Sequence, residues 1–125
     1  MKKRRDIGLY LTDILDSIGN IEEYIAGIGN AEDFLADKKT YDAVLRNLTV
    51  IGEAANKLSE EVRTKYPEIE WRDIVAMRNK LVHEYFGIDA DVTWAVVVKY
   101  LPELKKITEK MMGDFKKIPP DTYES

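Results

Sequence analysis

The segment Arg78–Tyr85, RNKLVHEY, gathers side chains that could carry out acid–base chemistry on a phosphate. An arginine guanidinium can hold two phosphate oxygens at once and neutralise the charge of a phosphorane-like transition state. Histidine titrates near neutrality and can act as a general base or a general acid. His83 is the only histidine of the chain. Cleavage of RNA through its own 2′-hydroxyl needs both a base and an acid, so a catalytic site here would favour a symmetric dimer.

The same polar groups also have a purely structural interpretation. On a helical wheel with about 100° per residue, Arg78 points into the middle of an apolar arc, and Tyr85 lies on the same stripe two turns later. Asn79 and His83 lie on the border of that arc. A guanidinium among apolar neighbours is costly unless it is paired, and Glu53 is one candidate partner for it. From the residues alone, a salt-bridged arginine and a polar cleft at a subunit interface both stay open.

The apolar residues of the chain recur with helical spacing and predict a scaffold made only of helices. We expect four main helices, over about residues 3–26, 39–65, 71–85 and 92 onward. Asn30 should cap a short helical turn after the first of them, and Asp89 or Asp91 should cap the fourth. The predicted fold is therefore an all-α, up-and-down bundle of four main helices plus a short helical turn, in a single domain of residues 1–125.

Two positions and one segment mark departures from regular helices. Gly52 lies on the apolar face of the second helix, where a glycine costs roughly 1 kcal/mol relative to alanine. We therefore expect another helix to cross close to it. Pro102 should kink the fourth helix and account for a shift of its apolar stripe. Residues 113–125, which end in KKIPPDTYES, are predicted to form a flexible tail.

Composition excludes several classes of protein. The 125 residues include 34% charged and 45% hydrophobic residues, and the formal net charge of −4 is unlike that of a general nucleic-acid coat protein. Cysteine is missing, and one histidine without a carboxylate cluster predicts no zinc or magnesium site. No apolar run reaches the roughly 18 residues of a membrane span, and no signal peptide is recognisable. We expect a cytoplasmic protein without cofactors and without a membrane partner.

The segment around the arginine and the histidine resembles a known family. RNKLVHEY matches the R-x4-H-x-Y motif of the HEPN superfamily, and specifically of its HepT-like members. Three flanking stretches agree in the same order: IGEAANKLS (residues 51–59), YPEIEW (66–71) and FGIDADVTW (86–94). The motif alone is short, and these flanks make the resemblance specific over about residues 5–112.

The resemblance implies a HEPN-like homodimer with the R-x4-H motifs near its interface. It implies a metal-independent endoribonuclease that acts on RNA as the toxin of a toxin–antitoxin system. Arg78 and His83 are then the catalytic pair, and Asn79 is a supporting residue. The implied partner is a minimal nucleotidyltransferase, the cognate antitoxin, which inhibits the toxin by transferring AMP to the motif tyrosine, here Tyr85. Because Tyr85 lies on the Arg78 stripe of the predicted helix, an anionic AMP there would block the cleft.

Two other hypotheses stay open at the level of sequence. The chain could be a non-catalytic substrate- or nucleotide-binding subunit of a two-component nucleotidyltransferase. It could also be a structural helical dimer in which Arg78 only forms a salt bridge. The sequence carries no P-loop and no glycine-rich nucleotide fingerprint, so the chain is not expected to use ATP by itself. Glu53 and Asn56, one turn apart, could face the cleft or the partner.

Overall fold

Helices and the short connections between them make up the part of the chain that the structure describes. The computed structural model describes residues 4–83 and 89–117, and no strand is present in these two ranges. In chain order the elements are α1 (Arg4–Tyr24), α2 (Ala31–Ala36), α3 (Lys38–Lys57), α4 (Glu60–Thr64), α5 (Trp71–His83), α6 (Ala90–Ala95), the π-helical turn η2 (Val96–Tyr100) and α7 (Leu101–Lys117). The predicted all-α class is confirmed.

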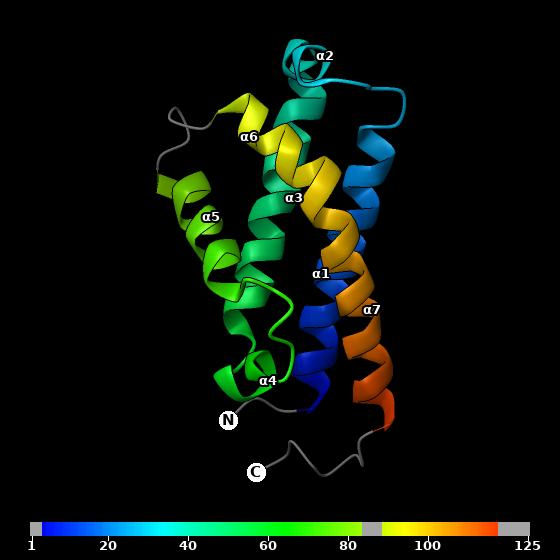
Figure 1. Ribbon diagram of the computed structural model, residues 1–125, viewed down its shortest axis with the longest axis vertical. Helices are drawn as coiled ribbons and strands as arrows, with labels where there is room; N and C mark the ends of the chain where they lie inside the picture. Colours follow the sequence, from blue (N-terminus) through cyan, green and yellow to red (C-terminus); the bar gives the residue numbers. More distant parts are fainter. Residues whose placement is uncertain (1–3, 84–88, 118–125) are drawn as a thin grey trace.

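The long helices lie side by side along the long axis of the molecule (Figure 1). α1 contacts α3 and α7, and α3 carries α5 on its outer side. α6, η2 and α7 follow one another without a break, and α6 contacts α2 at one end of the molecule. α4 lies at the opposite end, close to the start of α5. α5 is therefore a peripheral helix that is held mainly by α3.

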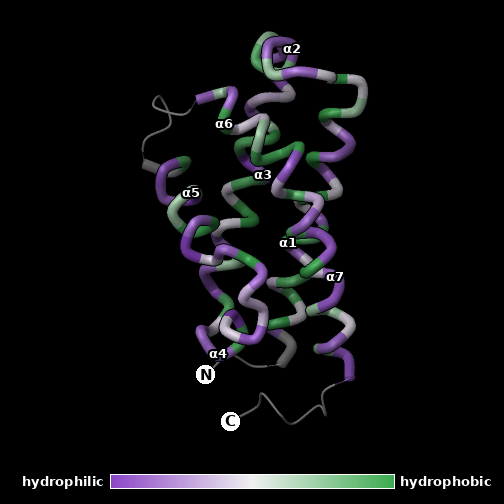
Figure 2. The backbone as a smooth tube through the Cα atoms, viewed as in Figure 1, coloured by the Kyte–Doolittle hydropathy of each residue, from purple (hydrophilic) through white to green (hydrophobic). Residues whose placement is uncertain are grey.

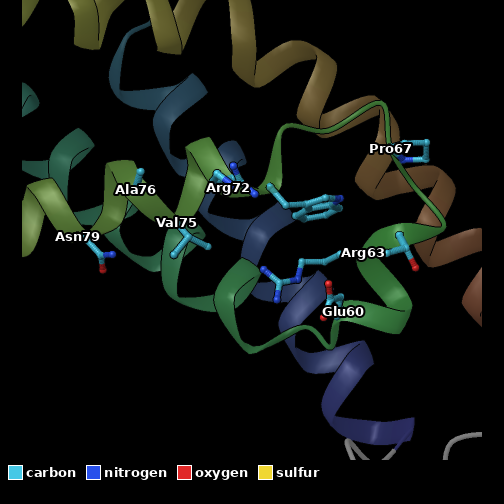
Figure 3. Close-up of a pocket in the computed structure, with 9 residues that line it drawn as sticks. Glu60, Arg63, Pro67, Arg72, Val75, Ala76 and Asn79 are labelled. Atoms are coloured by element: carbon cyan, nitrogen blue, oxygen red, sulfur yellow. The ribbon is translucent and has the colours of Figure 1, made fainter.

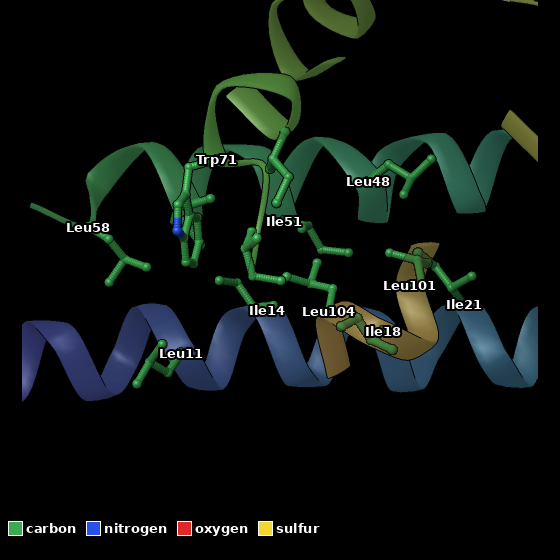
Figure 4. Close-up of a cluster of buried hydrophobic side chains, with 14 of the residues drawn as sticks. Leu11, Ile14, Ile18, Ile21, Leu48, Ile51, Leu58, Trp71, Leu101 and Leu104 are labelled. Atoms are coloured by element: carbon green, nitrogen blue, oxygen red, sulfur yellow. The ribbon is translucent and has the colours of Figure 1, made fainter. Parts of the chain in front are cut away.

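The core forms where the apolar stripes of α1 and α3 meet. Leu11, Ile14 and Ile18 of α1 face Leu48 and Ile51 of α3, and all five are at most 1% exposed (Figure 4). Burial of such side chains stabilises the fold by about 1.5–3 kcal/mol each. Residues of α5 and α7 complete this cluster. Figure 2 shows the resulting pattern, with hydrophobic segments turned inward and hydrophilic segments along the outside.

The second predicted helix is interrupted, so the prediction of one continuous helix over residues 39–65 is wrong. Leu58 has extended backbone angles (φ −67°, ψ 137°) between α3 and α4. Ser59 then starts a new helix, because its side chain accepts a hydrogen bond from the Val62 amide at 3.2 Å. The apolar spacing hid this break, since Leu58 and Val62 are both buried on either side of it.

The last predicted helix contains a π-helical turn, η2, where its apolar stripe changes phase. η2 ends at Tyr100, two residues before Pro102, and the Leu101 amide donates to the Val96 carbonyl, five residues back. A proline offers no N–H to the carbonyl four residues earlier, and the wider turn before it accommodates that loss. The extra residue shifts the apolar stripe, and α7 then buries Leu104 and Met111.

The helix caps at Asn30 and Asp89 agree with the prediction. Asn30 accepts a hydrogen bond from the Asp33 amide at 2.8 Å at the start of α2. Asp89, rather than Asp91, caps α6 and accepts from the Asp91 amide at 2.7 Å. The cap fixes the start of α6 directly after residues 84–88, which lie outside the described part of the chain.

α7 extends further than expected. Residues 113–117, predicted to begin a flexible tail, are helical, and Phe115 is only 9% exposed. Its ring lies against Gly8 of α1, where an added Cβ would come within 3.2 Å of it. This contact holds the last turn of α7 against the core. The rest of the predicted tail, residues 118–125, lies outside the described residues.

Candidate active site

α5 carries the candidate site and is fixed by buried side chains along its length. Trp71 opens the helix, and its indole Nε1 donates to the Tyr66 carbonyl at 3.0 Å, which holds the preceding loop against the helix. Ile74 and Leu81, 2% and 7% exposed, face the core from the same side of α5. Asp73 in the first turn suits the positive end of the helix dipole. One face of α5 is thus held in the core while its other faces stay at the surface.

α3 and α5 approach closely at Gly52, and the helix crossing expected there is confirmed. A Cβ at this position would overlap the Arg78 Cβ and would lie 2.9 Å from its Cγ and 3.3 Å from its Cα. Only glycine fits without a displacement of α5. Gly52 therefore sets the position of the Arg78 backbone and the direction in which its guanidinium leaves the helix.

The Arg78 guanidinium reaches two polar partners. Nη2 lies 3.6 Å from Glu53 Oε1 on α3, and Nη1 donates a hydrogen bond to Asn79 Oδ1 at 2.8 Å. Nε is buried and has no hydrogen-bond partner among the described residues. The ion pair with Glu53 that the sequence suggested is therefore present. The helical wheel placed Arg78 within the apolar arc. Its Cβ does pack against Gly52, whereas its guanidinium reaches the exposed carboxylate of Glu53.

This ion pair is open to solvent rather than enclosed in the core. The side chain of Arg78 is 28% exposed and that of Glu53 is 45% exposed. Such pairs contribute at most about 1 kcal/mol, because water screens them and two long side chains must be ordered. The guanidinium can therefore exchange its carboxylate contact for a bidentate contact with a phosphate at little cost.

The other motif residues follow along the same helix. Asn79 is exposed, and because its Oδ1 accepts from Arg78, its amide nitrogen is left to donate to a ligand. His83 is the last residue of α5, one turn beyond Asn79 in the helical register. Tyr85 lies outside the described residues. The structure thus brings Arg78, Asn79 and Glu53 together and continues their helix to the backbone of His83.

A groove of about 600 Å³, here called the polar groove, runs along an exposed face of α5 and reaches Asn79 (Figure 3). α5 forms one wall, and α4 with the loop after it forms the other. The Arg63 side chain extends from α4 toward α5, with Glu60 beside it (Figure 3). The lining combines two guanidinium groups, a carboxylate and apolar surface: Glu60, Arg63, Thr64, Pro67, Trp71, Arg72, Val75, Ala76 and Asn79.

A second groove of about 580 Å³, here called the apolar groove, lies between α5 and the segment formed by α6 and η2. Val92, which is 62% exposed, belongs to it. Burial raises the pKa of the Tyr100 hydroxyl to about 12, and the carboxylates of Asp73, Glu70 and Glu103 act in the same direction. The lining is mostly apolar and contains no arginine: Asp73, Ile74, Ala76, Met77, Lys80, Val92, Ala95, Val96 and Tyr100.

Sequence reasoning missed the polar groove. Arg63 belongs to α4, and the prediction of one continuous helix over residues 39–65 did not recognise α4 as a separate helix. A signal was present, because Ser59 followed by two glutamates is the pattern of a helix N-terminus. Arg72 also had a signal, since its separation of seven residues from Asn79 puts both on one face of a helix.

The fold and the site define a class of protein: an all-α bundle whose peripheral helix carries an arginine, an asparagine and a histidine beside a groove lined with further arginines. Comparison with known families agrees with this class. The chain matches the family described as ribonuclease HepT-like over residues 14–111, a range that contains α5 and both grooves. The chain belongs to the HepT-like ribonuclease family, as its motif and flanking stretches indicated.

Two relatives show how far the similarity extends. The chain is 46% identical over 102 residues to "Probable ribonuclease HepT" of Thermococcus cleftensis, and the match covers 82% of this chain and 92% of the relative. It is 42% identical over 114 residues to "Gamma-glutamylcyclotransferase and putative RNase" of Methanocaldococcus jannaschii. That match covers 91% of this chain and 51% of the relative, so the chain spans about half of that relative's length. No solved structure matches significantly.

Two further properties concern only residues 4–83 and 89–117. In these ranges no helix combines the length and the apolar character that crossing a membrane requires. The same ranges hold no group of three His, Cys, Asp or Glu side chains that could bind a metal ion.

Proposed function

We propose that the chain is a metal-independent endoribonuclease in which Arg78 and His83 form the catalytic pair and Asn79 supports them. The observation that carries this proposal is the Arg78 guanidinium. It is partly exposed, weakly paired and hydrogen-bonded to Asn79, on a helix that continues to His83. Membership of the HepT-like ribonuclease family and the name of the Thermococcus relative support the same activity.

Cleavage would use the 2′-hydroxyl of the RNA as the nucleophile. His83 would accept the hydroxyl proton while the 2′-oxygen bonds to the adjacent phosphorus, and the bond from phosphorus to the 5′-oxygen of the next nucleotide breaks. A second, protonated histidine would donate a proton to the departing oxygen, which leaves a 2′,3′-cyclic phosphate. Arg78 and the amide nitrogen of Asn79 would donate hydrogen bonds to the phosphate oxygens as these gain negative charge.

The second histidine implies a homodimer, because each chain has only one. The apolar groove offers a surface for the second copy. Its lining is mostly apolar, it adjoins α5, and Val92 in its wall is 62% exposed in the single chain. A copy seated there would bring its own Arg78 and His83 toward the same cleft.

The biological role that we propose is that of a toxin, inhibited by a cognate minimal nucleotidyltransferase acting as antitoxin. In the inhibiting step the Tyr85 oxygen attacks the α-phosphorus of ATP, the hydroxyl proton passes to a base, and pyrophosphate leaves. The resulting AMP ester carries a negative charge two residues after His83, so it would compete with RNA for Arg78. The R-x4-H-x-Y motif supports this role.

Cleavage of total cellular RNA in EDTA tests the proposed activity. The wild-type protein should cleave, and Arg78→Ala and His83→Ala should each reduce cleavage by roughly 10²–10⁴-fold. Arg78→Lys keeps the charge but loses the planar fork, so it should restore only part of the rate. Lys106→Gln, on the exposed face of α7, is the control for the loss of one positive charge.

Stability and intact mass complete this test. Arg78→Ala should lower the free energy of unfolding by at most about 1 kcal/mol, because its ion pair is exposed. A loss of roughly 3–5 kcal/mol would instead indicate a structural arginine whose removal leaves a buried charge unpaired. If wild-type protein with Tyr85 shown by mass to be unmodified does not cleave RNA, the proposal is overturned in favour of a non-catalytic binding subunit.

A further inference from the structure

One face of α5 connects the polar groove to the candidate catalytic residues. Arg72, Val75, Ala76 and Asn79 follow one another at separations of three, one and three residues, which places them on a single face of the helix. His83 comes four residues after Asn79 and continues that register. From Arg72 to His83 the backbone advances eleven residues, about 16 Å at 1.5 Å per residue. The polar groove thus leads along the helix to the motif.

Two guanidinium groups in this groove have no ion-pair partner among the described residues. Arg63 extends into the groove from α4, and its Nε is buried without a hydrogen bond. Arg72 lies in the first turn of α5, and neither it nor Arg63 takes part in the ion pairs of residues 4–83 and 89–117. In a chain with a net charge of −4, two arginines that face one groove and have no ion-pair partner in the described ranges offer local positive charge to an anion.

The rest of the lining suits a nucleotide strand better than a small anion. Val75 and Ala76 supply apolar surface along α5 between Arg72 and Asn79, and Pro67 adds apolar surface on the loop after α4 (Figure 3). A base or a ribose can pack on such surface. A strand also meets the requirement of two phosphate contacts at separate points along one groove. An unpaired strand fits this lining, because its bases are free to lie on a protein surface.

We propose that the polar groove binds the single-stranded RNA next to the phosphate that is cleaved, with Arg63 and Arg72 each contacting a phosphate of that strand. The apolar surface of Val75 and Ala76 then packs against a nucleotide between Arg72 and Asn79. This inference rests on the proposed ribonuclease function and adds a substrate-binding site to it. Arg63 and Arg72 are binding residues in this scheme, since neither contacts the phosphate at which the chain is cut.

Glu60 offers a substitution that should strengthen RNA binding, in contrast to the arginine substitutions that should weaken it. It is the carboxylate of the lining and lies beside Arg63 (Figure 3). A phosphate in the groove would be repelled by it. Glu60→Gln keeps the size of the side chain and removes its charge at an exposed position in the first turn of α4. This variant should therefore bind RNA more tightly than the wild type, whereas loss of either arginine should weaken binding.

The experiment measures binding of a fluorescent single-stranded oligoribonucleotide by anisotropy in EDTA at several salt concentrations. The oligonucleotide carries 2′-O-methyl groups, which cannot supply the attacking oxygen. Arg63→Gln and Arg72→Gln should each weaken binding roughly tenfold at low salt and reduce the slope of log K against log salt by about 0.7. Arg63→Lys and Arg72→Lys should restore most of the binding. Lys106→Gln on α7 should behave as the wild type.

Cleavage of the unmodified oligoribonucleotide by the same variants separates the possible outcomes. Weaker binding and a higher KM with nearly unchanged kcat would support the groove and the ribonuclease together. Unchanged binding in both arginine variants of an active enzyme would overturn the groove alone and leave it to another occupant, such as an acidic protein surface. Groove-dependent binding without any cleavage by the wild type would keep the groove and overturn the ribonuclease. A wild type that neither binds nor cleaves RNA would overturn both.

Discussion

The two grooves beside α5 are nearly equal in size and opposite in chemistry. The polar groove measures about 600 Å³ and contains Arg63 and Arg72, whereas the apolar groove measures about 580 Å³ and contains no arginine. Both include Ala76, so one small residue lies at the boundary between them. The two proposed occupants therefore follow from the charge of the lining and not from the volume of the groove. One helix can present a surface for phosphates on one side and a surface for another protein chain on the other.

The largest effect is expected in the apolar groove. Val92→Asp places a charge on a side chain that is 62% exposed in the single chain and would be buried in the proposed dimer. The dimer should dissociate, and cleavage should fall by roughly 10²-fold or more, because each site loses the partner's histidine. Light scattering and the RNA cleavage rate measure these two effects.

Val98→Asp is the matched control for this prediction. Val98 is 45% exposed on η2 but does not line the apolar groove. The variant should stay dimeric and active. If Val92→Asp also remains a fully active dimer, the apolar groove is not the dimer interface. The two grooves would then no longer be assigned to different partners.

A moderate effect is expected where α5 rests on α3. Gly52→Ala forces a methyl group against the Arg78 Cβ, so the free energy of unfolding should fall by roughly 1–3 kcal/mol and the wall shared by both grooves should move. Gly19→Ala on α1 adds a Cβ with no atom within 4 Å and should stabilise the protein by roughly 0.5–1 kcal/mol. Denaturant unfolding measures the change in the free energy of unfolding for both variants. A Gly52→Ala variant as stable as the wild type, or more stable, would contradict the close helix crossing.

The smallest effect is expected at Tyr100, and only in alkaline solution. Burial raises its pKa from 10.0 to about 12 in the folded protein, so the unfolded chain loses the hydroxyl proton first. The stability that results is fully present below pH 10 and is lost as the pH rises toward about 12. Tyr100→Phe has no such proton, so its stability should decline less over this interval. Urea unfolding of both proteins at about pH 8 and about pH 11 measures the difference, and equal declines would show that Tyr100 is not shielded by the groove.

The sequence predicts structure well where a local signal and burial agree. Asn30 caps a helix by its own side chain, and Gly52 on an apolar face already implied a close helix crossing. The pairing of Arg78 with Glu53 could also be named as a candidate, because one apolar face brought their two helices together.

The remaining features depend on signals that apolar spacing conceals. Leu58 and Val62 are buried on both sides of the break at Ser59, so the hydrophobic pattern alone reads as one helix. The polar groove could not be predicted from the sequence for a second reason. Arg63 and Arg72 belong to different helices, and their relative position is set by the loop that the Trp71 indole holds in place, which no periodicity describes.

The π-helical turn η2 contains one residue more than an ordinary helical turn would need. Deletion of a single codon within residues 96–100 would convert it to an α-helical turn, and α6 would rotate by about 100° relative to α7. Val92 would then leave the wall of the apolar groove, although no hydrophobic residue of α6 had changed. The proposed dimer should accordingly be lost through a one-residue deletion that leaves every side chain of α6 in place.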